Sequence, residues 1–505
     1  DSSIAAPTNG STQNVSTNGG TTAYSAATVA LSTTITAVND APVASGSATL
    51  AAVNEDTSSP PGATVSSLFG GNFSDAADQV AGGSSANTLA GVAISGYTAD
   101  STKGVWQYSS NGTAWTTIGS VSVVTSALSL KSTDLLRFLP AANWNGTAPT
   151  LTVKLIDSST TVTTGATVNA TGGGTTAYSS ATVTLGTTIT AVNDAPVASG
   201  SATLAAVNED TSSPSGDTVT NLFTRNFSDS TDTVAGGSTA NSFMGVVVTG
   251  NAATTAQGTW QWNNAGTWTN IATTLSDSSG LFLTTATGIR FLPAANFNGA
   301  PGSLTVRLVD SSIAAPANGS TQNVSSNGGT TAYSAATVAL STTITAVNDA
   351  PVATGSATLA AVDEDTPSPP GATVSSLFGG NFSDSTDTVA GGSTANSFIG
   401  VVVTGNAATA AQGTWQWLNG STWTNIVTSL SDSSGLFLTT ATSVRFAPAK
   451  DFNGAPGSLT VRLVDSSIAA PTNGSTQNVS TNGGTTAYSA ATVALSTTIT
   501  AVNDA

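Results

Sequence analysis

The sequence predicts an all-β chain built from tandem β-sandwich repeats of about 155 residues each. Three observations predict this fold class: a fixed internal period, strict alternation of apolar and polar residues, and turn sequences rich in Gly and Asn. AVNDAP occurs at 37–42, 191–196 and 346–351, and AVNDA closes the chain. The aspartates of the four copies are 154, 155 and 155 residues apart.

This period divides the chain into three repeats with a partial one in front. We expect β-sandwiches at 42–195 (repeat 1), 196–350 (repeat 2) and 351–505 (repeat 3), arranged as a linear rod. Residues 1–41 are identical to residues 465–505. We therefore interpret 1–41 as the terminal strands of a preceding, incomplete repeat.

The alternation of apolar and polar residues predicts the strands. Val29, Leu31 and Ile35 alternate with polar residues in ATVALSTTITAV, and the apolar residues of LTVKLI at 151–156 alternate in the same way. Such runs bury one face and expose the other, which is typical of antiparallel sheets. Only VSSLFGGNF at 65–73 predicts a short helical turn, and GTWQWNNAGTWTNI at 258–271 predicts a hairpin with aromatic pairs across its strands.

Composition excludes several functional classes. Only 7% of the 505 residues are charged, the net charge is −17, and the chain has neither His nor Cys. This balance disfavours a nucleic-acid partner, and the missing residue types remove disulfides, imidazole bases and ordinary zinc sites. No apolar run is long enough for a membrane span in this segment. We expect that the protein is not an enzyme.

The acidic residues recur at six positions in every repeat, whereas only two basic positions recur. The recurring acids are Asp40, Glu55, Asp56, Asp75, Asp78 and Asp157, then Asp194, Glu209, Asp210, Asp229, Asp232 and Asp310, then Asp349, Glu364, Asp365, Asp384, Asp387 and Asp465, with Asp504 in the last AVNDA. Converging carboxylates that lack basic partners repel one another, and Ca²⁺ relieves this with oxygen ligands alone. The alternative for any single acid is an Asx turn or a helix cap.

The order of motifs resembles a known family. AVNDAPVA, NEDT, FSD, FLPAANWNG, LTVKLIDSS and a final TTITAVNDAP follow one another as in bacterial cadherin-like and VCBS-type tandem repeats of large extracellular adhesins. The resemblance implies immunoglobulin- or cadherin-like sandwiches that bind Ca²⁺ near their junctions. The implied ligands are Asp40 from the linker, Glu55, the loop acids Asp75 and Asp78, and Asp157. Many relatives carry a denser DxDxD-like loop where this chain has only SDAAD and SDSTD.

These observations predict the structural repeat region of a bacterial extracellular adhesin or surface filament, stiffened by calcium and active in projection, adhesion or biofilm and fibre formation. Expected partners are neighbouring copies of the same repeat, in the same chain or in a homopolymer, together with a glycan or surface receptor. Two alternatives stay open. Separate subunits could polymerise by strand complementation through residues 1–41, or exposed tryptophans, Trp262 and Trp417, could form an array of carbohydrate-binding sites.

Overall fold

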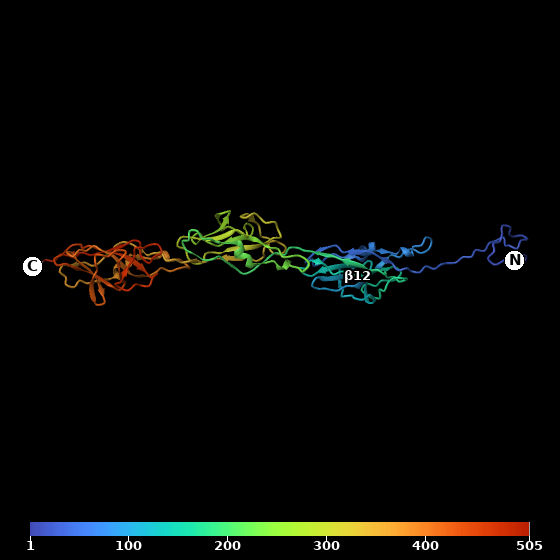
Figure 1. The fold of residues 1–505 in the computed structure, drawn as a ribbon, viewed down its shortest axis with the longest axis horizontal. Coiled ribbons are helices and arrows are strands. Elements are labelled where there is room, and N and C mark those ends of the chain that lie inside the picture. The colour runs from blue at the N-terminus through green and yellow to red at the C-terminus, as the bar shows by residue number, and fades with distance from the viewer. Residues whose placement is uncertain (504–505) are drawn as a thin grey trace. The chain divides into compact units, whose positions relative to one another are not determined.

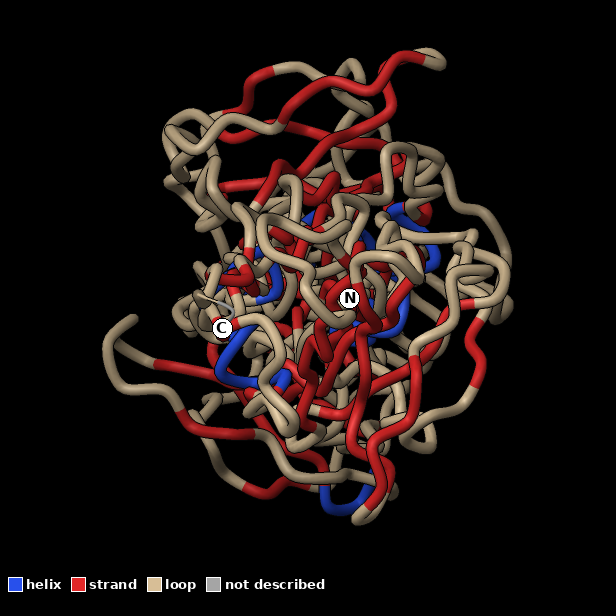
Figure 2. Tube along the Cα trace, turned by 90° about the vertical axis from the view of Figure 1, so that its left-hand side faces the viewer, coloured by secondary structure: helices blue, strands red, loops and turns tan. Residues whose placement is uncertain are grey.

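The computed structural model describes residues 1–503, which form three copies of one strand-rich arrangement. Strands and loops make up nearly the whole trace, with a few short helices (Figure 2). The chain divides into two compact units. The first consists of Asp1–Val192 with Val234–Ser238, and the second holds the rest of the described chain, including all of repeat 3. Asp504, one of the predicted metal ligands, lies outside the described residues.

Each repeat contains a six-stranded sheet, a four-stranded sheet and two short sheets of two or three strands. In repeat 1 the six-stranded sheet has the order β13 (Thr167–Val168), β9 (Ala127–Lys131), β6 (Leu89–Gly96), β12 (Leu151–Asp157), β14 (Val183–Gly186) and β2 (Ser47–Thr49). The four-stranded sheet has the order β4 (Ala63–Thr64), β10 (Leu135–Pro140), β7 (Gly104–Ser109) and β8 (Thr116–Thr117). The shorter sheets are β11 (Gly146–Thr147), β15 (Thr188–Thr190) and β3 (Val53–Asn54), and β1 (Val43–Ala44) with β5 (Phe73–Ser74).

Repeat 2 has the same organisation. Its six-stranded sheet is β17 (Ala202–Thr203), β28 (Val338–Ser341), β26 (Leu304–Asp310), β21 (Phe243–Asn251), β24 (Gly280–Thr284) and β27 (Thr321–Gln322). Its four-stranded sheet is β19 (Asp217–Thr218), β25 (Gly288–Pro293), β22 (Gly258–Asn264) and β23 (Thr267–Asn270). The pairs are β16 (Val197–Ala198) with β20 (Phe227–Ser228), and β18 (Val207–Asn208) with β29 (Ile344–Thr345).

Repeat 3 follows the order of repeat 2 strand for strand. Its six-stranded sheet is β31 (Ala357–Thr358), β42 (Val493–Ser496), β40 (Leu459–Asp465), β35 (Phe398–Asn406), β38 (Gly435–Thr439) and β41 (Thr476–Gln477). Its four-stranded sheet is β33 (Ala372–Thr373), β39 (Ser443–Pro448), β36 (Gly413–Asn419) and β37 (Thr422–Asn425). The pairs are β30 (Val352–Ala353) with β34 (Phe382–Ser383), and β32 (Val362–Asp363) with β43 (Ile499–Thr500).

The predicted helical turn is present in each repeat. Its copies are α1 (Val65–Phe69), α2 (Val219–Phe223) and α3 (Val374–Phe378), each followed by a 3₁₀ turn, η1 (Gly70–Asn72), η4 (Thr224–Asn226) or η6 (Gly379–Asn381). Thr64 caps α1, because its hydroxyl accepts the backbone N–H of Ser67. The other 3₁₀ turns are η2 (Ala76–Asp78), η5 (Ser230–Asp232), η7 (Ser385–Asp387) and η3 (Val124–Ser126). No helix within residues 1–503 has the length and apolar character needed to cross a bilayer.

The main sheets are antiparallel, as their alternation predicts, with one exception in each repeat. In the six-stranded sheet of each repeat, the edge strand from the beginning of the repeat runs parallel to its neighbour. These pairs are β2 with β14, β17 with β28, and β31 with β42. The two sheets enclose one core, which in repeat 1 contains Val92 and Ile94 of β6 together with Leu136 of β10. Apolar side chains of both sheets therefore face inward, which is the arrangement of a β-sandwich.

Residues 1–41 differ from the prediction, because they contain no strand. Figure 1 draws them in dark blue as a plain line. Val29, Leu31 and Ile35 are 96%, 100% and 91% exposed. The identical residues at the other end of the chain form β42 and β43, where Val493, Leu495 and Ile499 are buried. The same letters form a strand only where β40, β31 and β32 supply hydrogen-bonding partners.

Candidate metal-binding clusters

A cluster of three acids and two asparagines lies at one end of each repeat. In repeat 2 the acids are Asp229, which directly precedes the 3₁₀ turn η5, Asp232, the last residue of that turn, and Asp310, the last residue of β26. Asn193 comes from the AVNDAP segment, and Asn241 precedes β21. The fold therefore brings together polar residues that are more than a hundred positions apart in the sequence.

Two asparagine side chains connect these carboxylates. The backbone N–H of Asn241 donates to Asp229 Oδ2 at 2.5 Å, and its Nδ2 donates to Asp232 Oδ2 at 2.9 Å and to Asn193 Oδ1 at 2.8 Å. Asn193 Nδ2 donates in turn to Asp310 Oδ2 at 3.4 Å. The same bonds recur in the other repeats, through Asn87 and Asn39 in repeat 1 and through Asn396 and Asn348 in repeat 3.

Asp229 is buried with one oxygen unsatisfied. Its side chain is 5% exposed, and Oδ1 has no hydrogen-bond partner. Burial raises the pKa of Asp229 to about 6; the negative charges of Asp232 and Asp310 contribute to this rise, and the backbone bond from Asn241 opposes it. Asp384 of repeat 3 has the same orphaned oxygen and a pKa raised by burial to about 6. Burial also raises the pKa of Asp75, whose Oδ1 is orphaned as well.

The second acidic pair, from NEDT, lies with other residues. Glu209 accepts the N–H of Val347 at 2.5 Å on Oε1 and Asn298 Nδ2 at 2.9 Å on Oε2. Asp210 has a φ of 58° and accepts the N–H of Asn296 at 2.8 Å. The equivalents are Glu55 and Asp56 in repeat 1, and Glu364 and Asp365 in repeat 3.

Within the second unit this pair approaches the acids of the next repeat. Burial raises the pKa of Asp349, the acid of the linker into repeat 3, and the negative charges of Asp210, Asp387 and Glu209 raise it further. The N–H of Asp349 also donates to Asp387 Oδ1 at 2.9 Å. Carboxylates of repeats 2 and 3 therefore converge on one linker, as expected for a charged junction.

The predicted ligands are thus brought together only in part. Asp40, Asp75, Asp78 and Asp157 meet in repeat 1, since the N–H of Asp40 donates to Asp78 Oδ1 at 2.8 Å and the charges of Asp78 and Asp157 act on Asp75. Glu55 does not join them: its carboxylate accepts the side chain of Asn145 and the N–H of Val192. Glu55 and Asp75 therefore have different hydrogen-bond partners in the structure.

The chemistry of the clusters fits a hard cation, although their present geometry is that of a hydrogen-bonded network. Within residues 1–503 no three acidic side chains are gathered closely enough to hold a metal ion as they stand. Carboxylate and amide oxygens are nevertheless the donors that Ca²⁺ takes. Asp75, Asp229 and Asp384 each have an orphaned buried oxygen. Such a group is costly unless a proton or a cation compensates it.

Sequence reasoning missed the asparagines. Asn39, Asn87 and Asn145, with their equivalents in the other repeats, make the bonds described above. The available signal was their recurrence: an Asn stands at the corresponding place in every repeat, just as the acids do.

The tryptophans behave as core residues. Trp106, Trp260 and Trp415 are fully buried, and each indole N–H donates to a backbone carbonyl. Trp262 and Trp417 are each 6% exposed, so the predicted sugar platforms at these two rings are wrong. The hairpin β22–β23 is confirmed, but its aromatic residues do not face one another. Trp260 instead contacts Phe291 of β25 edge to face, with the ring centroids 5.2 Å apart.

Comparison with known proteins returns similar structures only. No protein-family model and no curated protein matches the chain. Mouse cadherin-23 EC22–24 is 11% identical with a TM-score of 0.39, and covers 92% of this chain and 100% of its own. Mouse clustered PcdhgC3 EC1–3 is 11% identical with a TM-score of 0.34, over 90% and 100%. Drosophila N-cadherin EC1–4 is 10% identical with a TM-score of 0.28, over 93% and 76%. Values this low carry no inference about function.

Proposed function

We propose that this chain is the structural repeat region of a bacterial extracellular adhesin or surface filament, and that Ca²⁺ stiffens the junctions between its repeats. Its partners are neighbouring copies of the same repeat, and it has no catalytic role. Repetition of one polar cluster in near-identical domains supports a structural role, because a rod requires the same junction many times.

The buried oxygen of Asp384 is the observation that carries the calcium proposal. A carboxylate that is almost fully buried, has one unpaired oxygen and has a pKa raised to about 6 is poorly compensated at neutral pH. A divalent cation supplies the missing positive charge without histidine or thiolate ligands.

The residues that would hold the ion at the junction in the second unit come from both repeats. Repeat 3 supplies Asp384, Asp387 and Asp465 together with Asp349 of the linker, and repeat 2 supplies Glu209 and Asp210. When bound, Ca²⁺ supplies charge neutralisation and cross-linking. The asparagine amides that now bond the carboxylates also carry oxygens, which can serve as ligands when the amides turn.

Extracellular calcium modules have dissociation constants of roughly 0.1–1 mM, and at ten times this concentration each site adds about 1.4 kcal/mol of stability. The larger expected effect is mechanical, because an ion shared by two repeats restrains the angle between them. Small-angle scattering of the full chain with Ca²⁺ and with chelator tests this. We expect a larger maximum dimension and less flexibility with Ca²⁺; unchanged curves contradict the proposal.

A matched pair of variants assigns the effect to the cluster. Asp384→Asn with Asp387→Asn should abolish calcium binding at one junction, measured as lost stoichiometry by isothermal titration calorimetry. Asp432→Asn is the control, because Asp432 pairs with Arg462 instead of the cluster. Equal losses in both variants would mean that the ion binds elsewhere.

A further inference from the structure

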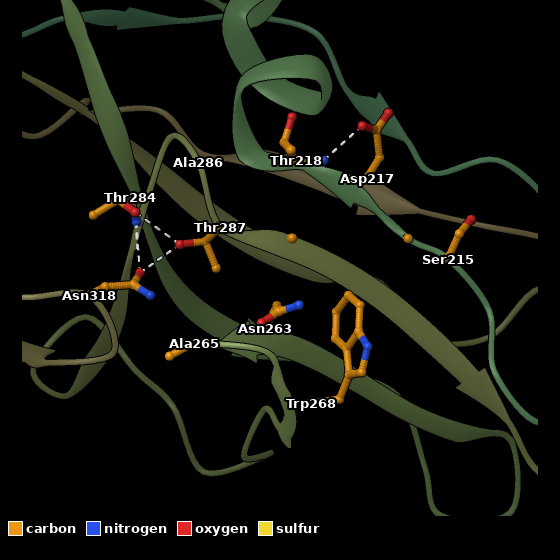
Figure 3. Close-up of a pocket in the computed structure, with 12 residues that line it drawn as sticks. Ser215, Asp217, Thr218, Asn263, Ala265, Trp268, Thr284, Ala286, Thr287 and Asn318 are labelled. Atoms are coloured by element: carbon orange, nitrogen blue, oxygen red, sulfur yellow. Dashed lines mark hydrogen bonds between the residues drawn. The ribbon is translucent and has the colours of Figure 1, made fainter.

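Repeat 2 contains a pocket of about 550 Å³ that opens beside Trp268 on β23. Figure 3 shows its lining: Asn263 and Trp268 lie on one side, the side chains of Thr284, Thr287 and Asn318 on the other, and Asp217 near the helix. None of these residues belongs to the acidic clusters. The pocket is therefore independent of the calcium proposal.

The pocket arises from a loop that differs in repeat 2. In repeats 1 and 3 a Pro-Pro-Gly loop covers the edge of the equivalent indole, so that a β-carbon on Gly62 would lie 2.5 Å from Trp115 Cη2, and one on Gly371 would lie 2.6 Å from Trp423 Cη2. In repeat 2 the second proline is replaced by Ser215. Gly216 has a φ of 73°, and a β-carbon on it would lie closest to Ile289 and Arg290 instead of the tryptophan.

Other substitutions make the opened space polar and roomy. Asp217 stands where repeat 3 has Ala372, and Asn263 stands where repeat 3 has Leu418. Gly288, which lies against Trp268, replaces Ser443. Repeats 2 and 3 also differ elsewhere, for example at Arg225, where repeat 3 has Gly380, but the differences at Ser215, Asp217, Asn263 and Gly288 all line this one pocket.

Asp217, Asn263 and Asn318 each use one side-chain oxygen in hydrogen bonds within the protein. Asp217 Oδ1 accepts the N–H of Thr218 and Asn221 Nδ2, both at 2.7 Å. Asn263 Oδ1 accepts the N–H of Gly266 at 2.7 Å.

Asn318 is fixed in the same way, because its Oδ1 accepts Thr287 Oγ1 at 2.7 Å and the N–H of Thr284 at 3.0 Å. Within residues 1–503 these bonds leave one carboxylate oxygen of Asp217 as an acceptor, and the amide groups of Asn263 and Asn318 as donors.

We propose that this pocket binds a neutral sugar ring. An aromatic ring with fixed acceptors and donors around it suits a ligand whose ring carbons are apolar and whose hydroxyls both donate and accept. The guanidinium of Arg290 lies 4.3 Å from the centroid of the Trp268 ring, which disfavours a cationic ligand on that ring, and the charge of Asp217 disfavours an anionic one. Neither repeat 1 nor the described part of repeat 3 combines the altered loop with Asp217 and Asn263, so one sugar should bind per chain of this sequence.

Saturation-transfer NMR of the full chain, with gluco-, manno- and galacto-configured neutral trisaccharides as probes, tests this. We expect at least one of the three sugar series to bind with one site per chain. The variant Asp217→Ala with Asn263→Leu should bind at least tenfold more weakly. Both replacements introduce the residues of repeat 3, so the fold should tolerate them, and an unchanged circular dichroism spectrum checks this.

Leu418→Ala in repeat 3 is the matched control and should leave the affinity unchanged. Adding chelator should also leave it unchanged, which separates this site from the calcium clusters. The proposal is overturned if no neutral trisaccharide binds, or if binding survives in the Asp217→Ala, Asn263→Leu variant.

Discussion

Asn298 of repeat 2 and Ser393 of repeat 3 exchange two hydrogen bonds within the second unit. Asn298 Nδ2 donates to Ser393 Oγ at 2.8 Å, and the N–H of Ser393 donates to Asn298 Oδ1 at 2.6 Å. The same Nδ2 donates to Glu209 Oε2 at 2.9 Å. One buried amide thus links an acid of the proposed metal site to the backbone of the next repeat.

Replacing Asn298 by Leu should loosen this junction. The change removes three hydrogen bonds and leaves the Ser393 N–H unpaired, which costs roughly 2–3 kcal/mol of local stability. Hydrogen exchange should then show faster exchange at Ser393. Asn453→Leu is the control, since Asn453 makes the equivalent bond to Glu364 in repeat 3. If Ser393 exchanges equally fast in both variants, the amide of Asn298 does not hold the junction.

The buried acids predict a pH dependence of stability in the absence of calcium. Burial raises the pKa of Asp229 and of Asp384 to about 6, from an ordinary value of 3.8. Between these values the folded state binds more protons than the unfolded state, so the free energy of unfolding falls as pH rises. The stability contribution of the protonated groups is complete below pH 3.8 and is lost as pH rises to about 6.

The variant Asp229→Asn with Asp384→Asn isolates this effect. An amide does not titrate, so the stability of the wild type relative to the variant should decline between about pH 4 and 7, by on the order of 2–3 kcal/mol per aspartate. Urea denaturation in chelator at several pH values measures the difference. A difference in stability that does not depend on pH would show that burial does not raise the pKa of these carboxylates.

Arg307 should tolerate replacement by Lys poorly. Its Nε and Nη2 donate to the two oxygens of Asp277 at 2.8 and 2.7 Å, and Nη1 donates to the carbonyls of Ser334 and Ala335. A lysine cannot reproduce this planar set, so Arg307→Lys should cost roughly 1–2 kcal/mol.

Denaturation with urea again provides the measurement, and Lys450→Met is the contrasting variant. Lys450 and Asp451 form an exposed pair, with side chains 85% and 56% accessible. Exposed ion pairs contribute about 0–1 kcal/mol, so this variant should be nearly neutral. Equal losses in the two variants would contradict the assignment of stability to the bidentate geometry.

The sequence predicted those strands and helices that depend only on neighbouring residues. The alternation in LTVKLI produced β12, and VSSLF produced the short helix α1. The partners of Glu55 could not be predicted, because Asn145 lies 90 residues away and the sequence does not show which ends of the sandwich meet. Trp268 and its pocket were missed for a different reason: the exposure of a ring depends on the loop that covers it, and Ser215 changed that loop.

The identity of residues 1–41 and 465–505 predicts assembly by strand exchange in a shortened chain. A chain that ends at Asp465 lacks β41, β42 and β43, which leaves β31 and β32 without partners and exposes the edge of β40 that does not pair with β35. The exposed Val29, Leu31 and Ile35 of a second molecule carry the residues that are buried in β42 and β43. Head-to-tail oligomers should form, because such a contact does not close on itself.

Light scattering after size-exclusion chromatography measures this assembly, and Leu31→Asp in the same shortened chain should return it to a monomer. Complementation is wrong if the shortened chain is monomeric, or if the Leu31→Asp variant assembles equally well.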